Sequence, residues 1–169
     1  MQDTHPAPEI LVVDNDERIV ELLSWFLRKR GYEVRSAATF EEARERLRER
    51  RPDLMLSDID MGLESALEEL PRLHALGVLP PTLVVSGFLD ATTSAELTSL
   101  GPVLGTLAKP FDFTDLEARV QECLEALRAG APGRPARGQH DWSEIIPARA
   151  GRAAAFERTA TIESTPRQE

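Results

Sequence analysis

The 169-residue chain lacks several features that mark large classes of proteins. It has one cysteine, Cys123, so no disulfide can form within it, which fits a reducing compartment. No apolar run approaches the roughly 20 residues that a membrane-spanning helix needs. The N-terminus has neither the basic start nor the apolar stretch of a secretory signal. These absences predict a cytoplasmic protein with no membrane partner.

Basic residues are scarce as well. The chain has 20 lysines and arginines against 29 aspartates and glutamates, for a net charge of −9. A nucleic-acid binder needs a basic surface to replace the counterions of phosphate, so this balance argues against nucleic acid as a partner. Apolar residues make up 41% of the chain, which is enough for a folded core.

The composition changes near residue 130. Residues 1–130 carry 14 basic and 24 acidic side chains, whereas residues 131–169 carry 6 and 5. Glycine and proline are dense from 129 to 138, as is typical of a linker. We therefore predict one domain at 9–129 and a Pro/Gly/Arg/Ala-rich linker with a largely disordered tail at 130–169. Within that tail, 141–146 is either a short docking motif or disordered.

Short apolar runs alternate with amphipathic segments in the first 130 residues. The runs predict buried strands at 10–13, around Val34, and at 54–56, 82–85 and 103–108. The spacing of apolar residues predicts helices at 19–27, 40–47, 66–73, 92–100 and 116–127. Five strands alternating with five helices indicate an α/β fold with a parallel sheet and helices on both faces.

Some details of these helices are also predicted. Pro71 is expected to break or kink the third helix, because it lacks an N–H group. Thr39 with Glu42, and Thr114 with Glu117, have the spacing of capping boxes. Trp25 in the first helix is interpreted as a packing residue in preference to a partner contact.

Polar residues collect where the predicted strands end. The carboxyl ends of parallel strands share one edge of a sheet, where functional groups usually lie. Carboxylates gathered there repel one another unless a hard cation such as Mg²⁺ binds between them. A lysine and a hydroxyl at the same edge would add donors for a phosphoryl group, and an aspartate could be the nucleophile. The residues concerned are Asp14, Asn15, Asp16, Asp58, Asp60, Ser86, Gly87 and Lys109.

Four motifs in this order resemble the receiver domain of two-component response regulators. They are ILVVDND, DLMLSDIDMG, LVVSG and LAKPF, and the resemblance covers about residues 9–128. It implies a flavodoxin-like, doubly wound sheet of five parallel strands in the order 2-1-3-4-5. It also implies a phosphoryl group received from a histidine kinase or phosphotransfer protein, and an output through protein contacts.

The resemblance assigns roles to individual residues. Asp58 matches the phospho-acceptor, and Asp14 matches an acid that helps to hold Mg²⁺. The main-chain carbonyl of Asp60 matches a further metal contact. Ser86 matches the switch hydroxyl, and Lys109 matches the lysine that pairs with the phosphoryl oxygens.

Two more residues are assigned in the same way. Gly87 matches the small position that leaves the acceptor accessible. Pro110 follows Lys109, and a cis peptide bond between them would aim the lysine.

Three positions depart from the family's pattern. Asn15 replaces the second acid of the first strand, so its amide would be a neutral metal ligand. Thr106 stands where the family usually has an aromatic switch residue, which predicts another route for the signal. Gly62 replaces a common proline, which is expected to loosen the loop without abolishing the chemistry.

Three functions follow as hypotheses. The first is a phosphoacceptor signalling protein, not a turnover enzyme, whose 39 residues after 130 are too few for a DNA-binding output domain and whose downstream protein effector is unknown. The second is a pseudo-receiver that binds partners without switching, which Asn15 and Thr106 suggest. The third, which fits less well, is a phosphatase similar to the haloacid dehalogenases, in which Asp14 and Asp16 would act and Asp58 would have no role.

Overall fold

The computed structural model of the protein describes residues 6–130. These residues form five strands and five helices in strict alternation. Their bounds are β1 Glu9–Val13, α1 Glu17–Lys29, β2 Glu33–Ala37, α2 Phe40–Glu49, β3 Leu54–Ser57, α3 Ala66–Ala75, β4 Thr82–Ser86, α4 Ala91–Thr98, β5 Val103–Ala108 and α5 Phe113–Arg128.

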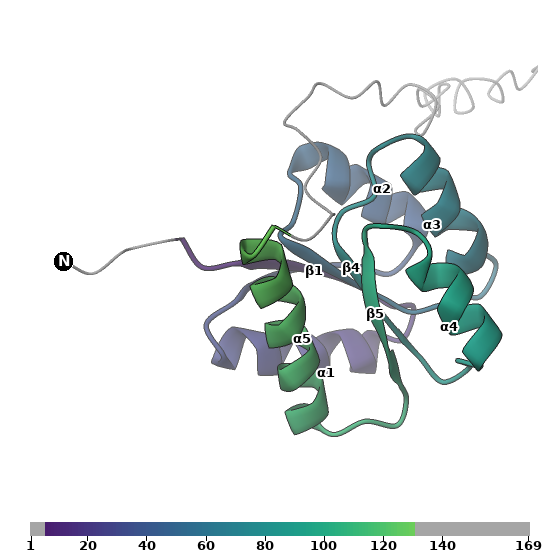
Figure 1. Cartoon of the computed structure of the whole chain (residues 1–169). Helices are drawn as coiled ribbons and strands as arrows, with labels where there is room; N and C mark the ends of the chain where they lie inside the picture. The colour runs from purple at the N-terminus through teal and green to yellow at the C-terminus, as the bar shows by residue number, and fades with distance from the viewer. Residues whose placement is uncertain (1–5, 131–169) are drawn as a thin grey trace, which may run out of the picture.

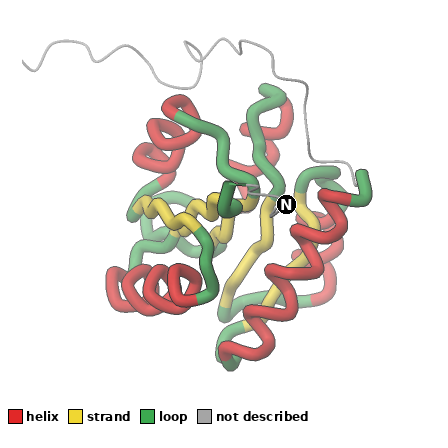
Figure 2. The backbone as a smooth tube through the Cα atoms, turned by 90° about the vertical axis from the view of Figure 1, so that its left-hand side faces the viewer, coloured by secondary structure: helices red, strands yellow, loops and turns green. Residues whose placement is uncertain are grey.

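The strands form one parallel sheet in the order β2-β1-β3-β4-β5, as the resemblance implied. Helices cover both of its faces (Figure 1 and Figure 2). The apolar clusters show that α1 and α5 pack on one face and α2, α3 and α4 on the other. The fold class predicted from the sequence is confirmed.

The three interior strands, β1, β3 and β4, are buried on both sides. In β1, Ile10 and Val12 pack toward α1 and α5, while Leu11 and Val13 pack toward the other three helices. Burying a side chain of this size stabilises the fold by about 1.5–3 kcal/mol. The neighbouring strand β3 pairs with β1 over its whole length. The ends of these two strands therefore provide a well-anchored base for the residues that follow them.

Of the two predicted helix caps, one is confirmed and one is wrong. Asp16 caps α1 by accepting the Arg18 N–H, and Thr39 caps α2 by accepting the Glu42 N–H. The predicted capping box at Thr114 is wrong, because Asp112 caps α5 and accepts the Asp115 N–H.

The earlier start of α5 has a physical reason. Its first residue, Phe113, stacks on Phe26 of α1 with 4.3 Å between the ring centroids. Stacked rings stabilise a contact beyond the area that they bury.

Pro71 was expected to break or kink α3, and the structure contradicts the break. The helix runs from Ala66 to Ala75 without interruption. Leu70 and Leu73 lie on either side of the proline in sequence, and both are fully buried in the core. Their burial holds the helix together despite the hydrogen bond that proline cannot make.

Two apolar side chains of α1 lie outside the core. Trp25 is 55% exposed and the ammonium of Lys29 lies 5.3 Å from its ring centroid, so its interpretation as a packing residue is wrong. Leu22 is 47% exposed, although its helical spacing placed it with the buried stripe. The core takes up Leu23, Phe26 and Leu27 from this helix, which leaves the other two facing outward.

The predicted linker and tail, including 141–146, lie outside the described residues. None of the helices within residues 6–130 has the length and apolar character to cross a membrane.

Candidate functional site at the carboxyl edge of the sheet

Lys109 joins two carboxylates that come from distant parts of the chain. Its Nζ lies 2.8 Å from Asp14 Oδ2 and 3.6 Å from Asp58 Oδ2. Asp14 directly follows β1, Asp58 follows β3, and Lys109 follows β5. The structure thus brings together the three charged residues on which the sequence argument depended.

The two aspartates differ in how their oxygens are used. Asp14 is almost completely buried, and both of its oxygens are occupied: Oδ1 accepts the Asp16 N–H and Oδ2 accepts from Lys109. Asp58 is more open, and its Oδ1 accepts the Ile59 N–H at 2.7 Å. Its Oδ2 stands beyond hydrogen-bond distance of the lysine. Asp58 Oδ2 is therefore the oxygen best placed to react with an incoming group.

The donor set suits a hard divalent cation. Two carboxylates and one ammonium group leave this part of the site with a formal charge of −1. Within the described residues, no three side chains of the His, Cys, Asp or Glu type gather closely enough to hold a metal by themselves. An ion here would therefore add the Asn15 amide or a main-chain carbonyl to Asp14 and Asp58. Such a mixture of oxygens and waters is what Mg²⁺ accepts.

The loop after β3 carries Asp60, the predicted third contact. The Asp60 carboxylate accepts the Gly62 N–H at 3.1 Å, so this side chain serves the loop and not the cluster around Lys109. Gly62 has a φ of 81°, a backbone conformation that proline cannot adopt. A Cβ built on Gly62 would lie 3.5 Å from Asn15 Nδ2, which shows that the two loops adjoin. The Gly62 N–H donates a hydrogen bond to Asp60, whereas the proline that is common here in the family has no N–H to donate.

Ser86 and Gly87 end β4 beside this cluster. Ser86 is buried, its hydroxyl accepts the Phe88 N–H at 3.3 Å, and its carbonyl accepts the Lys109 N–H at 2.9 Å. A Cβ on Gly87 would meet nothing within 4 Å, so packing does not require glycine there. The Lys109–Pro110 peptide bond is cis, as predicted.

Thr106 contacts both helices that flank β5. Its hydroxyl lies 3.0 Å from the Ser94 hydroxyl of α4, and its carbonyl accepts from Arg119 Nη2 of α5 at 3.0 Å. The guanidinium of Arg119 passes close to Gly105, where a Cβ would lie 3.3 Å from Nη2. The sequence argument did not single out Ser94 or Arg119. No local pattern marks them, because their contacts with Thr106 are long-range.

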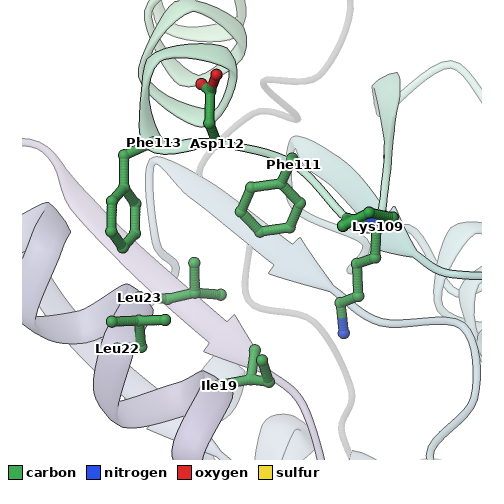
Figure 3. A pocket seen from close by; sticks show the side chains of 8 residues that line it. Ile19, Leu22, Leu23, Lys109, Phe111, Asp112 and Phe113 are labelled. Carbon is green, nitrogen blue, oxygen red and sulfur yellow. The ribbon is translucent and has the colours of Figure 1, made fainter.

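An apolar groove of about 650 Å³ opens beside Lys109, between α1 and the segment that leads into α5. Figure 3 shows Leu22 and Leu23 of α1 on one side and Phe111 and Phe113 on the other, with the Lys109 side chain at one end. The exposed Leu22 lines this groove. The full lining comprises Ile19, Leu22, Leu23, Lys109, Pro110, Phe111, Asp112 and Phe113.

The fold and the residues at its carboxyl edge define the class to which the protein belongs. A doubly wound sheet of order 2-1-3-4-5, with two aspartates and a lysine at one edge, is the architecture of the receivers of two-component signalling. A family model described as the response regulator receiver domain matches residues 10–121. The chain belongs to this family.

Known proteins agree with this assignment. The transcriptional regulatory protein ZraR of Escherichia coli O157:H7 is 32% identical over 155 residues, which cover 84% of this chain and 35% of ZraR. The chain thus spans about a third of the length of this curated relative.

Solved structures are similar as well. The CheY-like receiver domain protein of Methanospirillum hungatei is 27% identical, with a TM-score of 0.67 over 73% of this chain and 98% of that one. A response regulator of Burkholderia pseudomallei, solved with a phosphorylated aspartic acid, a calcium ion and citrate, is 26% identical. Its TM-score is 0.61 over 72% of this chain and 71% of that one.

Proposed function

We propose that the protein accepts a phosphoryl group on Asp58 from the phosphohistidine of a histidine kinase or phosphotransfer protein, in a Mg²⁺-dependent reaction. The observation that carries this proposal is the position of Lys109 Nζ, which reaches Asp14 and Asp58 together. A phosphoryl group on Asp58 Oδ2 would lie beside this ammonium group. The Burkholderia protein, with its phosphorylated aspartic acid and calcium ion, supports the same chemistry.

In the transfer, Asp58 Oδ2 forms a bond to phosphorus while the P–N bond of the donor breaks. The ring nitrogen of the donor keeps the electron pair of the broken bond. Lys109 offsets the charge of the phosphoryl oxygens, and Asp14 orients Lys109. Bound Mg²⁺ would stabilise negative charge in the transition state. Its ligands would be Asp14, Asn15, Asp58 and the carbonyl of Asp60.

The groove beside Lys109 is the docking surface for the donor protein in this scheme. It runs from Lys109 to α1, where Leu22 lines it and is exposed. An apolar segment of a donor that covers Leu22 and Phe111 would bring its phosphohistidine to the lysine. A small donor such as acetyl phosphate reaches Asp58 without this contact.

The output passes through α4, β5 and α5 to a downstream protein effector. Within α4 only Leu97 is buried, so this helix is lightly anchored, and Ser94 adds a bond to Thr106. A change at Ser86 would reach Thr106 through the β4–β5 ladder, in which Val84 faces Thr106 and Ser86 faces Ala108. The contact between the Ser94 and Thr106 hydroxyls would then transmit the phosphorylation signal that an aromatic side chain transmits elsewhere in the family.

The protein is a phosphoacceptor that catalyses only its own phosphorylation and dephosphorylation. We place this phosphoryl transfer in the cytoplasm. The acidic surface of residues 1–130 makes a protein, and not nucleic acid, the partner of this domain. The phosphatase hypothesis leaves Asp58 idle, yet Asp58 lies in the site beside Lys109.

The test is phosphorylation by acetyl phosphate and Mg²⁺, followed by intact mass and peptide mapping. Wild type gains one phosphoryl group and Asp58→Asn gains none. Asp16→Asn is the matched control, because Asp16 is an aspartate two residues from Asp14 that caps α1 and lies outside the proposed ligand set. Equal labelling of Asp58→Asn contradicts the acceptor assignment. If the wild type is not labelled and millimolar Mg²⁺ leaves its NMR spectrum unchanged, the pseudo-receiver hypothesis is favoured instead.

A further inference from the structure

The loop between β3 and α3 is secured to α2 by one carboxylate. Glu64 Oε2 accepts the Phe40 N–H at 2.8 Å, although the two residues are 24 positions apart. Phe40 is the first residue of α2, so Glu64 supplies an acceptor at the positive end of that helix. Thr39 caps the same helix from within its own segment, by accepting a different N–H.

A largely buried arginine supports this contact. Arg44 of α2 lies with its guanidinium 3.9 Å from Glu64 and 2.7 Å from Glu69 of α3. Glu69 is 8% exposed and Arg44 is 14% exposed at its side chain. The end of the loop and the first turns of α3 are therefore both attached to α2.

The loop is also held by packing, because Ile59 and Met61 are buried in the apolar cluster that includes Phe40 and Ala43. Leu63 is fully exposed and adds no packing, while Gly62 contributes no side chain. The hydrogen bonds within the loop join Met61 to Glu64 and Ala66 to Ile59. The chain folds back on itself there, and Asp60 bridges Ser65. Glu64 accepts the Met61 N–H with its main-chain carbonyl, so its side-chain contact with Phe40 adds a directional constraint to a loop whose apolar side chains are already packed.

We infer that Glu64 is a positioning residue for the phosphorylation site. By anchoring the loop to α2, it would restrain the main chain of Asp60, whose carbonyl would contact a metal ion held by Asp14 and Asp58. This inference rests on the proposed magnesium site. It predicts that Mg²⁺ affinity depends on a residue that touches neither the metal nor the phosphoryl group.

The experiment compares four variants by titration with Mg²⁺ alone, followed by the amide NMR shifts of residues 58–65. Glu64→Ala should raise the dissociation constant for Mg²⁺ about three- to tenfold, which corresponds to the net free energy of one hydrogen bond. Glu64→Gln keeps an oxygen for the Phe40 N–H and should restore the affinity to within about twofold. Thr39→Ala is the control for a weakened α2. Glu68→Ala is the control for an exposed glutamate of the same segment. Both controls should bind Mg²⁺ like the wild type.

A second measurement uses the metal-free protein, and it separates this inference from the proposed function. Glu64→Ala should speed the hydrogen exchange of the Met61 and Ala66 amides, and Thr39→Ala should not. If the wild type binds no Mg²⁺, the proposed metal site fails, and exchange alone decides whether Glu64 anchors the loop. The inference is overturned if Glu64→Ala leaves exchange unchanged. It is also overturned if Thr39→Ala weakens Mg²⁺ binding as much as Glu64→Ala does.

Discussion

Gly62 offers a direct test of the structure of the loop between β3 and α3. Its φ of 81° is a conformation that side-chain-bearing residues reach only at a cost of about 1–2 kcal/mol. Alanine also lowers the conformational entropy of the unfolded chain, which stabilises the folded state by about 0.4–1 kcal/mol. A Cβ at this position meets only Asn15 Nδ2, at an ordinary contact distance of 3.5 Å, so no clash adds to the sum. Gly62→Ala should therefore destabilise the fold by about 1 kcal/mol.

Two other glycines serve as matched controls. Gly31 has a φ of 89° and open space around it, so Gly31→Ala should cost the same amount. Gly101 also has open space but no positive φ, so Gly101→Ala should be neutral or slightly stabilising. The free energy of unfolding falls by about 2 kcal/mol per molar urea, so Gly62→Ala and Gly31→Ala should each lower the urea midpoint of unfolding by about 0.5 M.

The family's common residue gives the sharper form of the same test. Gly62→Pro should cost more than Gly62→Ala, because proline cannot reach this φ and loses the N–H that Asp60 accepts. The reasoning is refuted if Gly62→Ala behaves like Gly101→Ala, or if Gly62→Pro stabilises the protein.

Three further predictions concern the rest of the domain. Burial raises the pKa of the Cys123 thiol to about 11, so iodoacetamide at pH 8 should alkylate the unfolded chain far faster than the native protein, and equal rates would contradict this. The Thr93 N–H holds the pKa of Asp90 below its ordinary value of 3.8. The stabilising effect of Asp90 on α4 is therefore complete above pH 3.8 and is lost as the pH falls through the lower folded-state pKa of Asp90. NMR of the Thr93 amide during an acid titration should detect this loss. The amide of the Asp90→Asn variant should show no such change. Leu116 is fully buried, so Leu116→Ala should cost about 2–5 kcal/mol in urea unfolding, whereas Leu22→Ala, at a half-exposed position, should cost much less.

The sequence was sufficient for the sheet and for the residues at its edge. Asp14, Asp58, Ser86 and Lys109 each follow an apolar run, and the geometry of parallel strands then places them on one side. This inference needs only local patterns and a general rule of topology. It failed where two local patterns competed, as at the start of α5, because the stacking of Phe113 on Phe26 is a contact between distant segments.

Other features had no local signal at all. The contact of Glu64 with the α2 N-terminus and the contact of Ser94 with Thr106 join residues that are 24 and 12 positions apart. The packing interpretation of Trp25 failed because Leu23, Phe26 and Leu27 fill the core and decide which side of α1 faces inward. Long-range packing thus determines what the spacing of residue types leaves open.

The ion pair between Lys109 and Asp14 spans 95 positions of the chain, and this separation has a consequence for protein synthesis. A ribosome adds about 5–20 residues per second, so Lys109 is made roughly 5–20 s after Asp14. Until then the nascent chain holds Asp14 and Asp58 without the cation that stabilises them together. The cluster of Asp14, Asp58 and Lys109 is complete only when β5 joins the sheet. A copy phosphorylated with the help of Lys109 would therefore be one in which β5 has already joined the sheet.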